Sequence, residues 1–292
     1  MTQRTVFKIA LVGLPVGLAL SIVIALWLKM TGRTDRPARS RGNYGPEGAA
    51  GIFRQPVSEK EIERFLKVLT QDIGPRTHGA DPAAEKAVVA WLQGSLGSGN
   101  MGYRPEKRDF EADGAPSSAI MVEVSPVTGG RGRIVVLVPY DARPGDAGKG
   151  DQIHALAASL AAAHAITGES FPVGLTLVFA GNELAPKGTP SGWEAVKEQL
   201  APGLKGVLEI RSQIDTPPAP AAPATDPWTL SVDRALSTVP DSGLRREAPR
   251  LAGVPSVTIR ILGERGTQSP SEVVASQARA LETVLRDLAS GR

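Results

Sequence analysis

The chain has 292 residues, 41% of them hydrophobic and 22% charged, which is enough to bury one substantial core. Many positive residues behind its net charge of +3 lie between positions 29 and 41, directly after an apolar segment, so the charge indicates a membrane surface and no nucleic-acid partner. With no cysteine, thiolate chemistry, thiolate metal ligands and disulfides are excluded, and the three histidines limit metal or triad catalysis.

An uncharged apolar run covers residues 9–28 (IALVGLPVGLALSIVIALWL). A helix of about 20 residues rises far enough to cross the ~30 Å hydrocarbon layer of a bilayer. Trp27 lies where an interfacial aromatic residue belongs, and no small-residue cleavage site follows, so the run predicts an uncleaved anchor whose partner is the lipid bilayer. The predicted regions are an N-terminal tail (1–8), a transmembrane helix (9–28), a basic, glycine-rich linker (29–56) and one soluble domain (57–292).

Two arguments oppose each other on the orientation of this anchor. More basic residues follow the helix than precede it, where only Arg4 and Lys8 stand, and the positive-inside rule places the larger cluster in the cytoplasm. A short tail before an N-terminal anchor often gives the opposite topology, because features beyond charge also orient such helices. We expect a single-pass membrane protein with an extracytoplasmic domain.

The soluble part begins with two predicted amphipathic helices. Ser58 and Glu61 form a capping-box pattern, and the apolar residues that follow at helical spacing predict a helix over 59–70. After a Gly-Pro-Arg turn at 74–76, an alanine-rich stretch with one apolar face predicts a second helix over 81–96.

Apolar runs then alternate with helical patterns. Residues 108–124 predict one or two strands, and the continuous run RIVVLV at 133–138 is typical of a strand buried on both faces. The remaining predicted elements are helices over 152–166, 193–200 and 271–288, strands over 173–180, 206–210 and 257–261, and a Pro/Ala-rich surface loop at 217–227. This alternation predicts an α/β fold with a doubly wound, mostly parallel sheet flanked by helices.

Polar side chains directly follow the predicted central strands. Asp141 comes after the strand at 133–138, Asp151 opens the next helix, and Asn182 and Glu183 follow the strand at 173–180. Ligands of such sheets bind at the carboxyl ends of the strands, so these residues are the candidate site. Carboxylates there are also common helix caps, a role that Asp151 fits. No G-x-S-x-G nucleophile elbow supports a serine triad.

From about Ile73 to the C-terminus, the chain resembles the di-zinc aminopeptidases of peptidase family M twenty-eight, a family that also includes glutamate carboxypeptidases and the transferrin receptor. The runs that carry the resemblance are GPR (74–76), PYD (139–141), GKGD (148–151), FAGNE (179–183) and GVP (253–255). The resemblance implies an aminopeptidase-like fold with a place for two zinc ions.

Position by position, the resemblance implies a degenerate zinc site. Pro139 replaces the first histidine ligand, while Asp141 keeps the position of the residue that orients that ligand. Asp151 matches the aspartate that bridges both metals. Of the family's Glu-Glu pair, Asn182 replaces the general base and Glu183 keeps the ligand position.

The later ligands are also missing. Arg211 stands where the family has a ligand aspartate, and no histidine follows His164. A catalytic zinc normally needs three protein ligands and an open position, which Asp151 and Glu183 alone do not supply. We therefore expect no cofactor, vestigial metal positions, and a guanidinium that pairs with Asp151 or Glu183 in the volume left by the metals.

Three interpretations follow. The first is a membrane-anchored pseudopeptidase that acts as a non-catalytic binding or scaffold module, with a protein or peptide as the expected kind of partner. The second is an active metallo-aminopeptidase that releases N-terminal amino acids, in which His154 joins Asp151 and Glu183 as a third zinc ligand. The third is a shared α/β architecture without the family's function. Otherwise His154 and His164 are polar residues on a helix over the sheet, and His78 is exposed in a loop.

Overall fold

The computed structural model describes residues 54–127, 131–142, 152–184, 189–212, 221, 223–263 and 267–291. The chain divides into two compact units, Met1–Gly45 and Pro46–Arg292, and every described residue belongs to the second. None of the helices in the described ranges is both long and apolar enough for a bilayer, and the predicted anchor at 9–28 lies outside those ranges. The anchor therefore stays a prediction.

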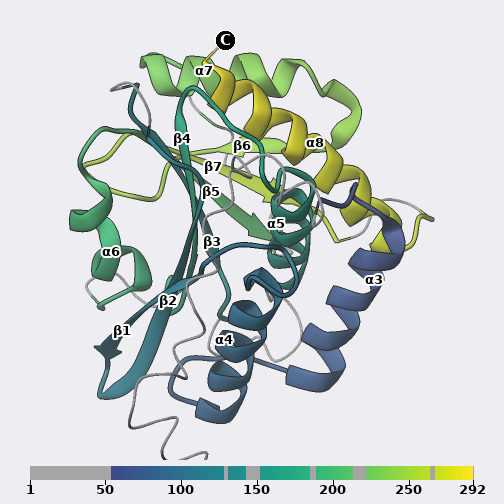
Figure 1. The fold of residues 1–292 in the computed structure, drawn as a ribbon, viewed down its shortest axis with the longest axis vertical. Coiled ribbons are helices and arrows are strands. Elements are labelled where there is room, and N and C mark those ends of the chain that lie inside the picture. The colour runs from purple at the N-terminus through teal and green to yellow at the C-terminus, as the bar shows by residue number, and fades with distance from the viewer. Residues whose placement is uncertain are drawn as a thin grey trace, which may run out of the picture. The chain divides into compact units, whose positions relative to one another are not determined.

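A seven-stranded mixed sheet with the order β1-β2-β4-β3-β5-β7-β6 forms the centre of the second unit (Figure 1). Its strands are β1 (Glu106–Ala112), β2 (Ala115–Ser125), β3 (Arg133–Pro139), β4 (Gly174–Ala180), β5 (Leu204–Ser212), β6 (Arg245–Glu247) and β7 (Ser256–Ile261). Neighbours among β4, β3, β5 and β7 pair in parallel, as predicted. The prediction is wrong at the margins, where β1, β2 and β6 are antiparallel.

A tight turn explains the antiparallel margin formed by β1 and β2. Asp113 and Gly114 connect the two strands, and both have left-handed backbone angles, with φ of 51° and 76°. An Asp-Gly pair in this conformation closes a hairpin, and a hairpin necessarily pairs its strands antiparallel. The stretch predicted as one or two strands is therefore two.

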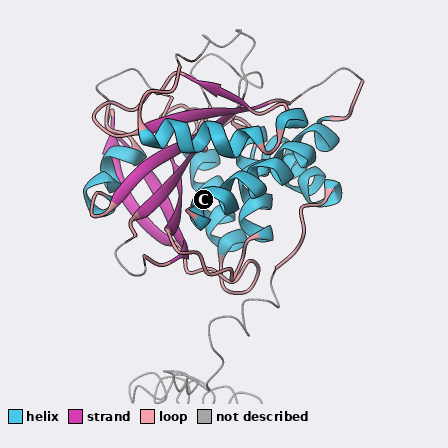
Figure 2. Cartoon of the chain, turned by 90° about the horizontal axis from the view of Figure 1, so that it is seen from above, coloured by secondary structure: helices cyan, strands magenta, loops and turns pink. Residues whose placement is uncertain are grey.

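Helices cover the two faces of the sheet unequally. They are α3 (Glu59–Lys67), α4 (Pro82–Leu96), α5 (Ile153–Ala165), α6 (Gly192–Leu200), α7 (Pro227–Ser237) and α8 (Pro270–Ser290), with a π-helix at Val68–Ile73 and a 3-10 turn at Pro240–Ser242. Apolar residues of α3, α4, α5, α7 and α8 share one large core with one face of the sheet, whereas α6 covers a smaller core on the other face. Figures 1 and 2 show this asymmetry, with most helices on one side of the strands.

The helices and strands predicted for the soluble domain are present, with bounds that differ by a few residues. The helix predicted over 59–70 ends at Lys67 and continues as the π-helix. Sequence reasoning missed α7 and β6. Asp226 caps α7 and Pro227 opens it, at the end of the stretch that was interpreted as a Pro/Ala-rich loop, and β6 has only three residues. Residues 217–220 and 222 of that predicted loop lie outside the described residues.

Buried Arg76, the last residue of the Gly-Pro-Arg turn, links the π-helix to the end of β3. Its side chain, only 1% exposed, donates hydrogen bonds to the carbonyl oxygens of Tyr140 (2.9 Å), Leu69 (3.1 Å) and Gly74 (2.7 Å). The amide of Ala142 in turn donates to the carbonyl of Arg76. The turn therefore fixes the backbone that follows the central strand.

Both edges of the sheet are polar or short. At one edge, β1 begins with four exposed charged residues, Glu106, Lys107, Arg108 and Asp109. At the other edge, β6 is a three-residue strand, Arg245–Glu247.

Candidate functional site

The carboxyl ends of β4, β3, β5 and β7 meet at one edge of the sheet because these strands are parallel. After β3 the chain forms β4 on one side of that strand, and after β4 it forms β5 on the other side. Such a reversal of strand order opens a crevice at the carboxyl ends in α/β sheets. The residues after these strands are therefore the candidate site, as the sequence predicts.

Asp141, after β3, holds the loop after β4. Its carboxylate accepts hydrogen bonds from the backbone amides of Glu183 (3.3 Å) and Leu184 (3.1 Å). The residue is 3% exposed, and burial raises the pKa of its carboxyl to about 6, although these hydrogen bonds and Arg211 oppose the shift. Asp141 thus positions the neighbouring loop, and its side chain is directed at protein backbone.

The two residues after β4 are also bonded to the protein. Asn182 has a left-handed backbone (φ 58°), and its amide donates to the carbonyl of Pro190 at 2.7 Å. The Glu183 carboxylate accepts a hydrogen bond from the amide of Trp193, in the first turn of α6, at 2.6 Å. Burial raises the pKa of Glu183 to about 8; the hydrogen bond from Trp193 opposes the shift, and the nearby Asp141 carboxylate adds to it.

A buried ion pair occupies the end of β5. Arg211 donates from Nε to Oε1 of Glu209 at 2.6 Å, and Thr258 of β7 donates to the other carboxylate oxygen at 2.8 Å. Glu209 is 0% and Arg211 7% exposed. Glu209 and Arg211 are two residues apart on one strand, so they project from the same face of the sheet.

The predicted salt bridge between Arg211 and the Glu183 carboxylate is wrong. Arg211 reaches Glu183 only through the backbone carbonyl of that residue, at 3.3 Å, while its ion pair is with Glu209. The other predicted partner, Asp151, lies outside the described residues. Sequence reasoning missed Glu209, although a glutamate inside the apolar run GVLEI, two residues before an arginine, is a readable signal for a buried ion pair.

The start of α5 is joined to the end of β5. Gln152 is fully buried and accepts a hydrogen bond from the amide of Ser212 at 3.0 Å, and the Ser212 hydroxyl accepts one from the amide of Ala155 at 3.0 Å. The imidazole of His154 packs against Gly263, where a side chain would collide with the ring. Burial lowers the pKa of His154 to about 4, which keeps the ring neutral.

The other two histidines lie in separate contacts. His78 was predicted to be exposed, but its side chain is only 9% exposed. One ring nitrogen lies 3.2 Å from Glu85 and the other 2.9 Å from the carbonyl of Ala112, which explains the burial. His164 pairs with Glu61 of α3 at 2.6 Å.

The described residues do not fit the zinc ions that the resemblance implies. The side chain of Pro139 has no atom that could coordinate a metal, the Asn182 amide is bonded to Pro190, and Arg211 brings a guanidinium to the end of β5. Within the ranges given above, no three His, Asp or Glu side chains come together as a metal-binding group. Asp151 lies outside these ranges, so the ligand set of Asp151, His154 and Glu183 stays a prediction.

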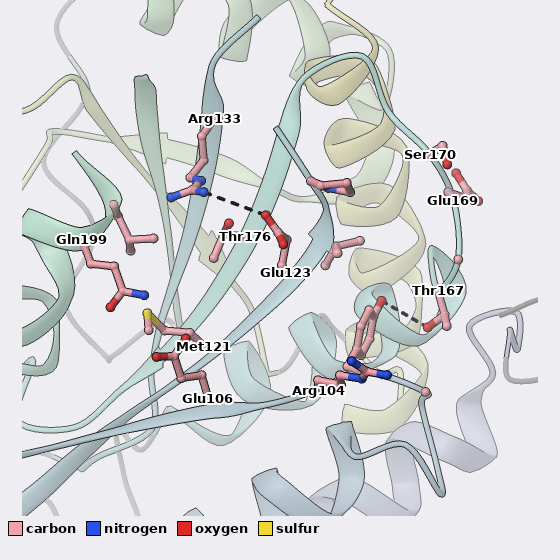
Figure 3. Close-up of a pocket in the computed structure, with 16 residues that line it drawn as sticks. Arg104, Glu106, Met121, Glu123, Arg133, Thr167, Glu169, Ser170, Thr176 and Gln199 are labelled. Atoms are coloured by element: carbon pink, nitrogen blue, oxygen red, sulfur yellow. Dashed lines mark hydrogen bonds and ion pairs between the residues drawn. The ribbon is translucent and has the colours of Figure 1, made fainter. Parts of the chain in front are cut away.

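A surface cavity of about 560 Å³ lies away from this cluster, at the amino ends of the parallel strands (Figure 3). Arg133, the first residue of β3, lines it and lies 3.9 Å from Glu123 of β2. Thr167, in the loop after α5, donates to the hydroxyl of Tyr103 at 3.1 Å. The cavity thus lies at the amino ends of the parallel strands, whereas Asp141 and Glu183 lie at their carboxyl ends.

No protein-family model and no curated protein sequence matches the chain. Solved structures share its fold. A glutaminyl cyclase of Macrostomum lignano has 12% identity and a TM-score of 0.58, with 85% of this chain and 93% of that chain covered. A zinc-dependent exopeptidase of Parabacteroides distasonis has 14% identity and a TM-score of 0.52, over 80% and 99% of the two chains.

A leucine aminopeptidase precursor of Bacteroides thetaiotaomicron gives a similar result, with 13% identity and a TM-score of 0.52 over 80% of this chain and 98% of that chain. The described domain therefore has the mixed α/β fold of zinc-dependent exopeptidases and glutaminyl cyclases. At these identities the likeness concerns the fold, and activity is a separate question.

Proposed function

We propose that this chain is a membrane-anchored protein whose aminopeptidase-like domain performs no zinc-dependent hydrolysis and acts as a binding or scaffold module. Residues 9–28 would hold it to the bilayer, with the domain outside the cytoplasm. The buried pair of Arg211 and Glu209 carries the proposal. A guanidinium at the end of β5, where the resemblance places a zinc ligand, repels a divalent cation and cannot coordinate one.

Two further contacts support the proposal. The Glu183 carboxylate is bonded to the first turn of α6, and burial disfavours its ionised, metal-binding form. Asn182 uses its amide on Pro190 and has no basic group that could take a proton from water. The side chains described at the strand ends thus bond to one another and to the backbone.

The test is the zinc content of the full-length protein after dialysis against zinc, together with hydrolysis of leucine p-nitroanilide. We expect substoichiometric zinc, no hydrolysis, and no change in either result for Asp151→Ala. Glu194→Ala is the matched control because it removes a carboxylate from the exposed side of α6. One zinc per chain that disappears in Asp151→Ala but persists in Glu194→Ala, with hydrolysis, would overturn the proposal in favour of the active metallo-aminopeptidase.

A further inference from the structure

The cavity at the amino ends of the parallel strands has room for a small organic molecule (Figure 3). Its volume of about 560 Å³ lies in the range of pockets that hold such molecules, roughly 300–1,000 Å³. Strands β2, β3 and β4 contribute Glu123, Arg133 and Thr176 to its lining, and the C-terminal end of α6 contributes Gln199 and Leu200. A central strand of the sheet thus brings a guanidinium to the cavity.

The backbone on both sides of β3 holds Arg133 in place. Arg133 is the first residue of β3, where it pairs with Gly174 of β4 and with Leu204 of β5. Its amide also donates to the carbonyl of Gly203 at 2.7 Å. The guanidinium is therefore carried by the rigid centre of the sheet, which limits the conformational entropy that a ligand would have to remove on binding.

The guanidinium of Arg133 has an ion-pair partner but no close acceptor. Its Nη2 lies 3.9 Å from a carboxylate oxygen of Glu123, which is longer than a hydrogen bond. The Glu123 side chain is 53% exposed and that of Arg133 19%, so water weakens this pair. Nε of Arg133 is enclosed and out of reach of a ligand. No hydrogen bond engages Nη1 or Nη2 within the described ranges, so these two atoms remain for a ligand.

The other charges of the lining determine which ligand charge fits. Two carboxylates are neutralised by ion pairs, Glu106 with Arg108 and Glu169 with Arg286. The pair described above and the exposed guanidinium of Arg104 remain, which amounts to two positive charges against one negative. This excess of one positive charge favours a ligand with a single negative charge.

The shape of the donor and the apolar part of the lining narrow the class further. The Nη1 and Nη2 atoms of a guanidinium donate two parallel hydrogen bonds to a carboxylate, in a geometry that fits its two oxygens. Met121, Val124 and Leu200, which are 4%, 7% and 3% exposed, add apolar surface to the lining. Such surface favours an aliphatic body on the ligand.

We infer that this cavity binds a small aliphatic monocarboxylate. The ligand carboxylate takes the place of Glu123 as the partner of Nη1 and Nη2 of Arg133, and the half-exposed Glu123 side chain turns to solvent. The aliphatic chain lies against Met121 and Leu200. The site is independent of the strand-end cluster and of the proposed function.

Pentanoate, pentanamide and pentylamine test the inference on the full-length protein in lipid nanodiscs. The methionine methyl groups are labelled with ¹³C, and the NMR signal of Met121 is assigned as the one that Met121→Leu removes. We expect pentanoate to shift this signal saturably. Met101 is the internal reference, because it lines a separate cavity together with Phe65 and Trp91, and its signal should stay in place.

The two other compounds keep the aliphatic chain and change the charge. Pentanamide has the same shape as pentanoate without the negative charge and should bind at least about tenfold more weakly, because hydrogen bonds to charged groups are the stronger ones. Pentylamine brings a positive charge to the guanidinium and should not bind.

Two variants test the roles of the ion pair. Arg133→Met should lose the preference for pentanoate over pentanamide. Glu123→Gln removes the competing carboxylate and should tighten pentanoate binding by about two- to fivefold, the size expected for an exposed ion pair. Lys107→Met is the matched control, because it removes one positive charge that pairs with Asp109 outside the lining, and it should change neither result.

The comparison of pentanoate with pentanamide on the unaltered protein needs no variant, so it decides the question even if Arg133→Met does not fold. An unshifted Met121 signal, equal affinity for pentanamide, or preferred binding of pentylamine would each overturn the inference. Weaker binding of pentanoate by Glu123→Gln would overturn it as well.

Discussion

Replacing Arg211 by methionine should destabilise the domain strongly. The substitution keeps an unbranched apolar stem but removes the guanidinium, and it leaves the Glu209 carboxylate, which is 0% exposed, with the Thr258 hydroxyl as the partner described for it. Removal of one member of a buried ion pair costs about 3–5 kcal/mol, because an uncompensated charge stays in the interior. That is a large share of a total folding free energy of about 5–15 kcal/mol.

Urea unfolding of the full-length protein, followed by far-UV circular dichroism, measures this effect. The double variant Glu209→Gln/Arg211→Met should recover much of the lost stability, because neither charge then remains buried. Lys197→Met is the control, since its partner Glu194 is exposed and such pairs contribute at most about 1 kcal/mol. A loss of less than about 1 kcal/mol for Arg211→Met would refute the reasoning about the buried pair.

Three further outcomes are expected. The pKa of Glu183 is about 8 in the folded chain against an ordinary value of 4.5, so the folded state binds this proton more tightly and its contribution to stability is lost as the pH rises from 4.5 to 8. Asp141, with a pKa raised to about 6, adds a slope of the same sign below pH 6, and His154, with a pKa lowered to about 4, adds one of opposite sign between pH 4 and 6.5. Between pH 6.5 and 8 the slope of the free energy of unfolding should therefore approach about 1.4 kcal/mol per pH unit and be lost in Glu183→Gln, and an unchanged slope for that variant in urea titrations would contradict this. Gly206→Ala drives a methyl group into the Trp228 ring and should cost about 1–3 kcal/mol, so an unaltered urea midpoint would count against the packing described. Ser269→Ala removes the reciprocal cap with Glu272 at the start of α8 and should cost about 0.5–2 kcal/mol, again read from the urea midpoint.

The core of the fold was predictable because its signals are local. The run at 133–138 is continuously apolar, which identifies a strand covered on both faces, and it forms the centre of the sheet. The Ser58 cap and the apolar stripe after it locate the first helix. The antiparallel pairing of β1 with β2 follows from the Asp113-Gly114 turn, and the sequence patterns did not show that this turn closes a hairpin.

The sequence predicted where the candidate site lies but not the contacts that its side chains make. Strand ends identified Asp141, Asn182 and Glu183, and the structure brings Asp141 into contact with the backbone of Glu183. The partner of Asp141 is 42 residues away. The partners of Asn182 and Glu183 are backbone groups of Pro190 and Trp193, eight and ten residues away, and residue patterns do not identify backbone partners. Arg211 was assigned to Asp151 or Glu183 because the resemblance puts these residues at the metal positions, yet the alternation of side chains along β5 places Glu209 on the same face as Arg211.

The charged edge of the sheet has a consequence for how copies of this protein meet. Free strand edges invite pairing with strands of other molecules, which leads to aggregation. Lys107 and Arg108 on exposed β1 would have to give up their hydration for such pairing, and β6 offers too short a strand to serve as a template. Copies of the domain at high concentration can therefore collide edge to edge without joining their sheets.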